Sequence, residues 1–159
     1  MNINIIAVGK IKEKYLKDAI DEYSKRLSRF CKLTITEIPD EPMSERPSDA
    51  EKAMVLKKEG DKILAAIKNT DVLVTLCVEG KQKSSEDFAD YISKECVKGA
   101  NTFTFIIGGS LGMMEEIKSK SNLKLSFSEM TFPHQLMRVI LLEQVYRAFK
   151  INANESYHK

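Results

Sequence analysis

The stretch of sequence that decides the fold is FTFIIGGSLG, residues 103–112. Its apolar run predicts a buried strand over Thr102–Ile107. Gly108 and Gly109 end that strand, and a strand that ends in glycines leaves backbone amides free to face a ligand at the carboxyl end of a sheet. The turn is not a Walker loop and lacks GxGxxG spacing. It therefore indicates either a tight strand-to-helix link or a binding site whose ligand need not be a phosphate.

Strand and helix patterns alternate on both sides of this stretch. Further strands are predicted at Asn2–Val8, Leu33–Thr36, Asp71–Val78 and Leu123–Phe127, and Gly80 is expected to stop the third strand along the chain. Ser48 with Glu51 forms a capping-box signature for one helix, and Ser84 or Ser85 caps the next. The alternation predicts an α/β fold with a mostly parallel sheet and helices on both faces.

Length and composition bound the class of protein. The 159 residues suffice for one domain, 1–159, and 43% hydrophobic with 30% charged residues is ordinary for a soluble globular protein. No apolar run is long enough for a membrane span, and the N-terminus enters a strand without a signal-peptide pattern, so we expect a cytoplasmic protein. The three cysteines form no CxxC pair, so neither a disulfide framework nor a zinc site is predicted.

The last predicted helix, Gln135–Lys150, is apolar on more than one side. Beyond a first apolar stripe, Met137, Leu141, Leu142 and Ala148 are also apolar, which exceeds what a surface helix needs. One side can pack on the sheet, and the remaining apolar surface needs another cover. A second copy is the simplest cover, so we predict a homodimer that a charge at Leu141 or Leu142 would disrupt.

The chain has two histidines, His134 and His158. His134 follows Pro133 at the start of the last helix, where it has room to cap or pack. His158 lies in a Tyr-His-Lys ending, which joins an aromatic, a titratable and a cationic group in a tail that would ordinarily fray. There is no Ser-His-Asp order, HExxH motif or pair of metal-binding carboxylates, so neither a hydrolase nor a metal site is predicted.

These segments together resemble the RlmH family of SPOUT methyltransferases. The motifs that carry the resemblance are IAVGK (6–10), VTL (74–76), FIIGG (105–109), LSFS (125–128), MTFPHQ (130–135), EQVYRAFK (143–150) and YHK (157–159). The resemblance spans essentially the whole chain and is densest in its last third.

The resemblance implies an enzyme that uses S-adenosylmethionine (SAM) to methylate N3 of a pseudouridine in large-subunit (23S) ribosomal RNA, acting on the assembled ribosome. It also implies a homodimer and a trefoil knot near the C-terminus, a rare exception to unthreaded topology. The alternatives are a SPOUT methyltransferase for another RNA position and a non-catalytic dimer that binds the ribosome. A protein that only binds would not need the Tyr-His-Lys ending beside the cofactor loop.

The resemblance further implies roles for single residues. The cofactor contacts are Leu76, Gly108, Gly109 and the run Phe127, Ser128, Glu129, Met130, Thr131 and Phe132. The candidates for positioning the target base or accepting its proton are Tyr157 and His158, helped by Arg147 and Glu143. An ordinary i, i+4 ion pair is the alternative for Glu143 and Arg147. Arg138 lies on another side of the helix from Arg147, so a different task is predicted for it.

Overall fold

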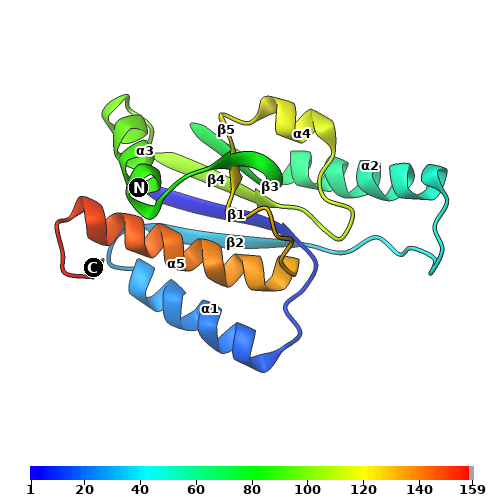
Figure 1. The fold of residues 1–159 in the computed structure, drawn as a ribbon, viewed down its shortest axis with the longest axis horizontal. Helices are drawn as coiled ribbons and strands as arrows, with labels where there is room; N and C mark the ends of the chain where they lie inside the picture. Colours follow the sequence, from blue (N-terminus) through cyan, green and yellow to red (C-terminus); the bar gives the residue numbers. More distant parts are fainter. Residues whose placement is uncertain (158–159) are drawn as a thin grey trace.

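The computed structural model describes residues 1–157 of the chain. It contains one parallel five-stranded sheet in the order β2-β1-β4-β3-β5 (Figure 1). The strands are β1 (Asn2–Val8), β2 (Lys32–Ile38), β3 (Val72–Gln82), β4 (Thr102–Ile107) and β5 (Leu123–Ser126). The strand predicted from the opening stretch lies at the centre of this sheet, between β1 and β3.

Helices cover both faces of the sheet, as predicted (Figure 1). They are α1 (Lys14–Leu27), α2 (Asp49–Ala66), α3 (Ser85–Val97), α4 (Glu115–Lys120) and α5 (His134–Asn152). Because side chains alternate along a strand, Ile3 and Ile5 of β1 pack with residues of α1, α3 and α5, whereas Ile6 packs with residues of α2 and α4. The sheet therefore separates two apolar cores. Among the described residues, no helix is long and apolar enough to cross a membrane.

Two helix starts follow from local sequence. The Ser48 hydroxyl accepts a hydrogen bond from the Glu51 backbone N–H at 3.1 Å, and the Ser84 hydroxyl accepts one from Asp87 at 3.0 Å. Each bond satisfies one of the backbone donors left free at a helix start. The Glu51 carboxylate does not complete the capping box, since it accepts bonds from the backbone and the hydroxyl of Ser44 instead.

The strand β3 is longer than predicted and does not stop at Gly80. It pairs with β5 at Leu76, leaves the regular register, and resumes pairing at Lys81, so that residues 77–80 form a bulge. A Cβ atom at Gly80 would lie 2.8 Å from the backbone of Lys124 and Leu125. Gly80 therefore permits the close approach that ends the bulge, and it does not break the strand.

The prediction that Leu141 and Leu142 are interface positions is wrong. Both side chains are fully buried in the core between the sheet and α1, α3 and α5. Helical periodicity cannot distinguish an apolar residue that faces the sheet from one that faces a partner. Most residues of α5 beyond Leu136 are buried or half-buried within this one chain.

Candidate functional site

A cavity of about 350 Å³ lies at the carboxyl ends of β3, β4 and β5. Its walls come from the bulge of β3, the turn after β4, the segment after β5, Lys118 of α4 and the start of α5. This is the edge at which open parallel sheets bind ligands. Among the residues predicted to bind a cofactor, the structure places Leu76, Gly108, Gly109, Phe127, Ser128, Met130, Thr131 and Phe132 in the lining, while Glu129 is not part of it.

The glycine turn after β4 is held closed by a hydrogen bond between two of its own residues. The Gly112 N–H donates to the Gly109 carbonyl at 3.0 Å, and Gly112 has a φ of +84°. A Cβ atom at Gly108 would lie 2.3 Å from the Gly112 carbonyl oxygen. No side chain can therefore be added at Gly108 without opening the turn, which forms one wall of the cavity.

The segment after β5 is shaped by two serines. The buried Ser126 hydroxyl donates to the Ser128 carbonyl at 2.9 Å, and the Ser128 hydroxyl accepts from the Met130 N–H at 3.0 Å. Such side-chain bonds to the nearby backbone fix irregular loops. They give the segment 127–132 a defined path along the cavity before Pro133 leads into α5.

A second group of polar residues gathers on α5. The Glu143 carboxylate accepts bonds from the Arg147 guanidinium at 2.6 and 2.9 Å and from the Tyr157 hydroxyl at 2.9 Å. The Arg147 guanidinium lies 4.7 Å from the centre of the Tyr157 ring. Glu143 and Arg147 thus form the i, i+4 ion pair that was the alternative to a catalytic role, and they also hold the last described residue of the chain. His158 lies outside the described residues.

The surroundings of Tyr157 favour the protonated form that a phenol already has at neutral pH. Burial and then the Glu143 carboxylate raise the pKa of the Tyr157 phenol above its ordinary value of 10. Burial and the same carboxylate raise the pKa of Tyr23 in α1. Both phenols therefore stay protonated at neutral pH and act as hydrogen-bond donors. Tyr157 is suited to positioning a group, and it is not suited to accepting a proton.

Within one chain, the cavity does not reach those catalytic candidates that the structure describes. His134 lines the cavity, whereas Glu143, Arg147 and Tyr157 do not. Met137 is the last residue of α5 in the lining, and Glu143 follows it by six residues of continuous helix, which places Glu143 about 9 Å further along the axis at 1.5 Å per residue. The structure therefore brings the predicted cofactor residues together around the cavity and the described catalytic candidates together on α5, and it keeps the two sets apart.

Arg138 has a different task from Arg147, as predicted. Its side chain is buried, its guanidinium forms a 2.7 Å ion pair with Glu37 of β2, and it donates to the carbonyls of Val8 and Gly9. These contacts tie the start of α5 to the carboxyl ends of β1 and β2. A buried charge needs such partners, so Arg138 holds the fold next to the cavity.

Sequence reasoning missed two charged residues of the cavity, Glu79 and Lys118. Glu79 lies in the β3 bulge, which the pattern of apolar residues did not reveal. Lys118 lies in the short helix α4, where a lysine is unremarkable. Only the packing of α4 beside the bulge places the two side chains in contact, at 2.6 Å.

An open parallel sheet with a cavity at its carboxyl edge defines an α/β protein built to bind a cofactor or other small ligand. The family model described as "Predicted SPOUT methyltransferase" matches residues 1–158, and the chain belongs to this family. Relatives named "Ribosomal RNA large subunit methyltransferase H" are 57% identical in Clostridium novyi and 55% identical in Clostridium botulinum, each over 159 residues and the full length of both chains.

Solved structures share the fold at low sequence identity. A probable methylase family protein from Haemophilus influenzae superposes with a TM-score of 0.60 at 11% identity, over 99% of this chain and 70% of that one. A Legionella pneumophila protein solved with bound SAM gives a TM-score of 0.51 at 13% identity, over 94% of this chain and 66% of that one. These likenesses confirm the predicted α/β fold class, while the trefoil knot stays a prediction.

Proposed function

We propose that this chain is a SAM-dependent methyltransferase that modifies N3 of a pseudouridine in large-subunit ribosomal RNA, acting on the assembled ribosome in the cytoplasm as a homodimer. The observation that carries the proposal is the cavity at the carboxyl edge of the sheet, lined by all but one, Glu129, of the residues that the resemblance had marked for the cofactor. The full-length identity of 57% to a relative named as a ribosomal RNA large subunit methyltransferase supports the RNA class.

The size and the lining of the cavity suit SAM. Its volume of about 350 Å³ lies within the range of small-molecule sites. Ile107, Leu125 and Met137 of the lining are apolar and suit a flat adenine. We assign its ring nitrogens to the main chain of the segment 127–132, as the resemblance implies. When bound, SAM supplies an electrophilic methyl group on its sulfonium sulfur.

The chain's own residues then have two tasks besides holding the cofactor. The target base must be held in line with the methyl group, and the N3 proton must be accepted. The protonated Tyr157 donates a hydrogen bond and offers a ring for stacking, so it serves in positioning. Glu143 and His158 are left as the candidates that accept or orient the proton, and Arg147 holds Glu143 in place.

The separation of α5's polar group from the cavity supports a site shared between two subunits. A group that acts on the target base must come within hydrogen-bond distance of it, and within one chain Glu143 lies about 9 Å along the helix from the cavity residue Met137. In a dimer, a second copy that covers the start of α5 can bring its own residues 157–159, the tail, to the cavity of the first copy. We therefore assign the tail to the partner's site.

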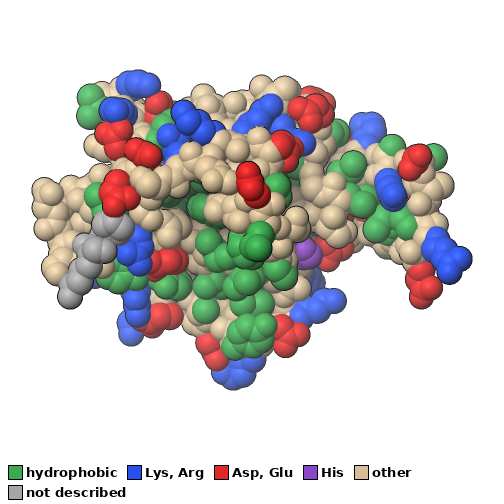
Figure 2. Space-filling model, in the orientation of Figure 1, with side chains coloured by type: hydrophobic (Ala, Val, Ile, Leu, Met, Phe, Trp, Pro, Cys, Tyr) green, Lys and Arg blue, Asp and Glu red, His purple; other side chains and the backbone are tan. Residues whose placement is uncertain are grey.

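An apolar surface is available for such a dimer. Figure 2 shows hydrophobic side chains gathered over α5 and the beginning of α1. Leu136 is 36% exposed and Tyr15 is 68% exposed. The Lys12 N–H donates to the Gln135 side chain, which joins the two segments. A large apolar surface of this kind on a small protein is typical of a subunit interface.

The dimer gives a prediction at Leu136. We expect Leu136→Glu to yield a folded monomer, because the side chain is exposed in one chain and would be buried against its partner. Leu142→Glu should instead unfold the protein, since an unpaired buried charge costs several kcal/mol. Sedimentation with circular dichroism separates the two outcomes. A wild-type protein that sediments as a monomer at micromolar concentration would refute the dimer.

The proposed activity is tested on ribosomes that lack the modification. We expect the purified protein to transfer one methyl group from SAM to N3 of a pseudouridine in their 23S RNA, as read by mass spectrometry of digested RNA. Ribosomes carrying uridine at that position are the matched control. Methylation of another position would support the alternative SPOUT enzyme, and SAM binding without any transfer would support the non-catalytic dimer.

A further inference from the structure

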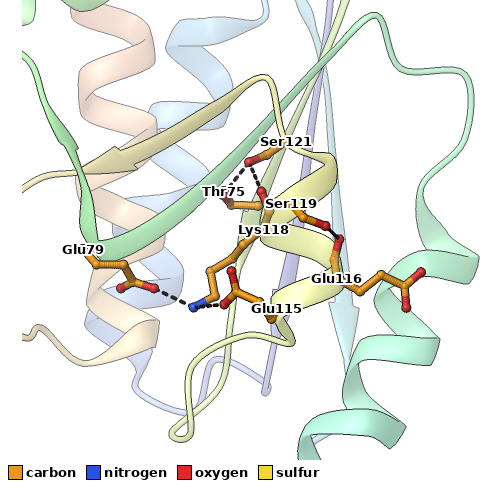
Figure 3. Close-up of polar contacts among 7 residues, drawn as sticks. All are labelled: Thr75, Glu79, Glu115, Glu116, Lys118, Ser119 and Ser121. Carbon is orange, nitrogen blue, oxygen red and sulfur yellow. Dashed lines mark hydrogen bonds and ion pairs between the residues drawn. The ribbon is translucent and has the colours of Figure 1, made fainter.

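Lys118 and Glu79, which both line the cavity, form a charged pair. Figure 3 shows the Lys118 side chain pointing toward Glu79 and Glu115. The Lys118 ammonium lies 2.6 Å from Glu79 of the β3 bulge and 3.2 Å from Glu115 of α4. Only 16% of the Lys118 side chain is exposed, whereas 59% of the Glu79 side chain is. The pair therefore combines a largely desolvated cation with an accessible anion at the same wall.

The charge of this pair is distinctive within the cavity. With histidine neutral, Glu79 and Lys118 are the only lining side chains, among the described residues, that carry a full charge at neutral pH. The ion pair with Glu79 raises the pKa of Lys118, and the same contact lowers the pKa of Glu79, so both groups stay charged. The rest of the lining offers apolar surface, backbone groups and hydroxyls.

Holding α4 in place does not require this pair. The Thr75 hydroxyl donates to Ser121 at 3.1 Å, and Ser121 in turn donates to the Lys118 carbonyl at 2.7 Å (Figure 3). Ile117 is fully buried against the sheet. These contacts fix both the end and the inner face of α4, so α4 has anchors other than the Lys118–Glu79 pair, and a ligand that matches both charges can exchange for their mutual contact.

We propose that Glu79 and Lys118 form the subsite for the amino-acid end of SAM, with Lys118 pairing with its carboxylate and Glu79 with its ammonium group. This assignment rests on the proposed function. An α-amino acid presents one positive and one negative group a few ångströms apart, and the lining offers one pair of opposite charges to match it. Glu115 makes the local net charge negative, which also suits the additional positive charge of the sulfonium.

The test pairs a protein change with a ligand change. Calorimetry measures the affinity of wild type and Lys118→Met for SAM and for decarboxylated SAM, which lacks only the carboxylate. We expect Lys118→Met to lower the affinity for SAM by about 10- to 100-fold, the scale of a lost charge-assisted hydrogen bond. The affinity for decarboxylated SAM should stay within about twofold of the wild-type value. This ligand has no carboxylate, so it makes no contact with Lys118 in either protein.

Two further variants complete the test. Glu79→Gln changes a largely exposed side chain. It should lower the affinity for SAM but not the affinity for 5′-methylthioadenosine, which lacks the whole amino-acid end. Lys120→Met removes an exposed ion pair with Glu116 on the same helix and away from the cavity, and it should bind every ligand like wild type.

The outcomes separate this subsite from the proposed function. The subsite is refuted, while the SAM site stands, if Lys118→Met has the wild-type affinity for SAM. The same holds if this variant loses affinity for SAM and for decarboxylated SAM in equal proportion. If the wild-type protein binds neither SAM nor 5′-methylthioadenosine, the proposed function fails, and the subsite fails with it.

Discussion

Deletion of residues 157–159 is expected to lower methyl transfer by orders of magnitude while leaving the protein folded and able to bind SAM. Tyr157 packs on the surface of α5 and contributes nothing to the two buried cores, so the loss of stability should be small. The deletion removes the positioning hydroxyl, the His158 imidazole and the Lys159 cation together. We expect a loss of about 100-fold or more in the rate of methyl incorporation into ribosomes, the scale of one acid–base group or more.

Single substitutions show how much of this loss of methyl transfer is due to each residue. Tyr157→Phe removes only the hydroxyl that donates to Glu143, and His158→Ala removes only the imidazole, so each should lose less than the deletion if positioning is shared. Glu143→Gln keeps the shape of the carboxylate and removes its charge. Calorimetric SAM titration on the same preparations is the control. Wild-type turnover by the truncated protein would show that the tail has no catalytic part.

The second large effect is expected at Gly108. A Cβ atom there would lie 2.3 Å from the Gly112 carbonyl, so Gly108→Val must displace the turn that walls the cavity. We expect SAM affinity to fall about 10- to 100-fold, in line with the cost of overpacking. Gly108→Ala should already show much of this loss, because the clash begins at Cβ. Affinity equal to that of wild type would contradict the cofactor site.

A matched glycine controls for general destabilisation. Gly99 follows α3, has a φ of +103°, and has nothing within 4 Å of an added Cβ. Gly99→Val should therefore strain the backbone and lower the melting temperature without changing SAM affinity. A comparable loss of SAM binding in Gly99→Val would mean that the Gly108 effect reports instability, not the cavity.

The tail deletion and Gly108→Val together test the shared site. The two defective chains can be co-expressed with different tags to form heterodimers. If the tail acts across the interface, each heterodimer contains one site in which an intact cavity meets an intact tail. We expect such heterodimers to regain up to half of the wild-type activity, since one of two sites is complete. If the tail acts on its own chain's cavity, each subunit lacks one part and no activity returns.

The sequence by itself determined the alternation of strands and helices, and with it the layered α/β fold. Apolar runs such as Thr102–Ile107 are long enough to bury, and local caps such as Ser48 mark helix starts through bonds within a few residues. The cofactor residues were predicted through the family motifs of the last third, and the structure places all of them but Glu129 at the cavity. These features depend on neighbours in the chain or on a pattern that the chain shares with its relatives.

Only the tertiary structure decided which apolar and charged groups face one another. Leu142 and Leu136 lie on one apolar helix, yet the first is fully buried in the core and the second is exposed, because the direction of the sheet relative to α5 is set by packing. Lys118 and Glu79 are 39 residues apart and meet through the bulge of β3 beside α4. Contacts of this kind arise from the packing of distant segments, and helical or strand periodicity carries no information about them.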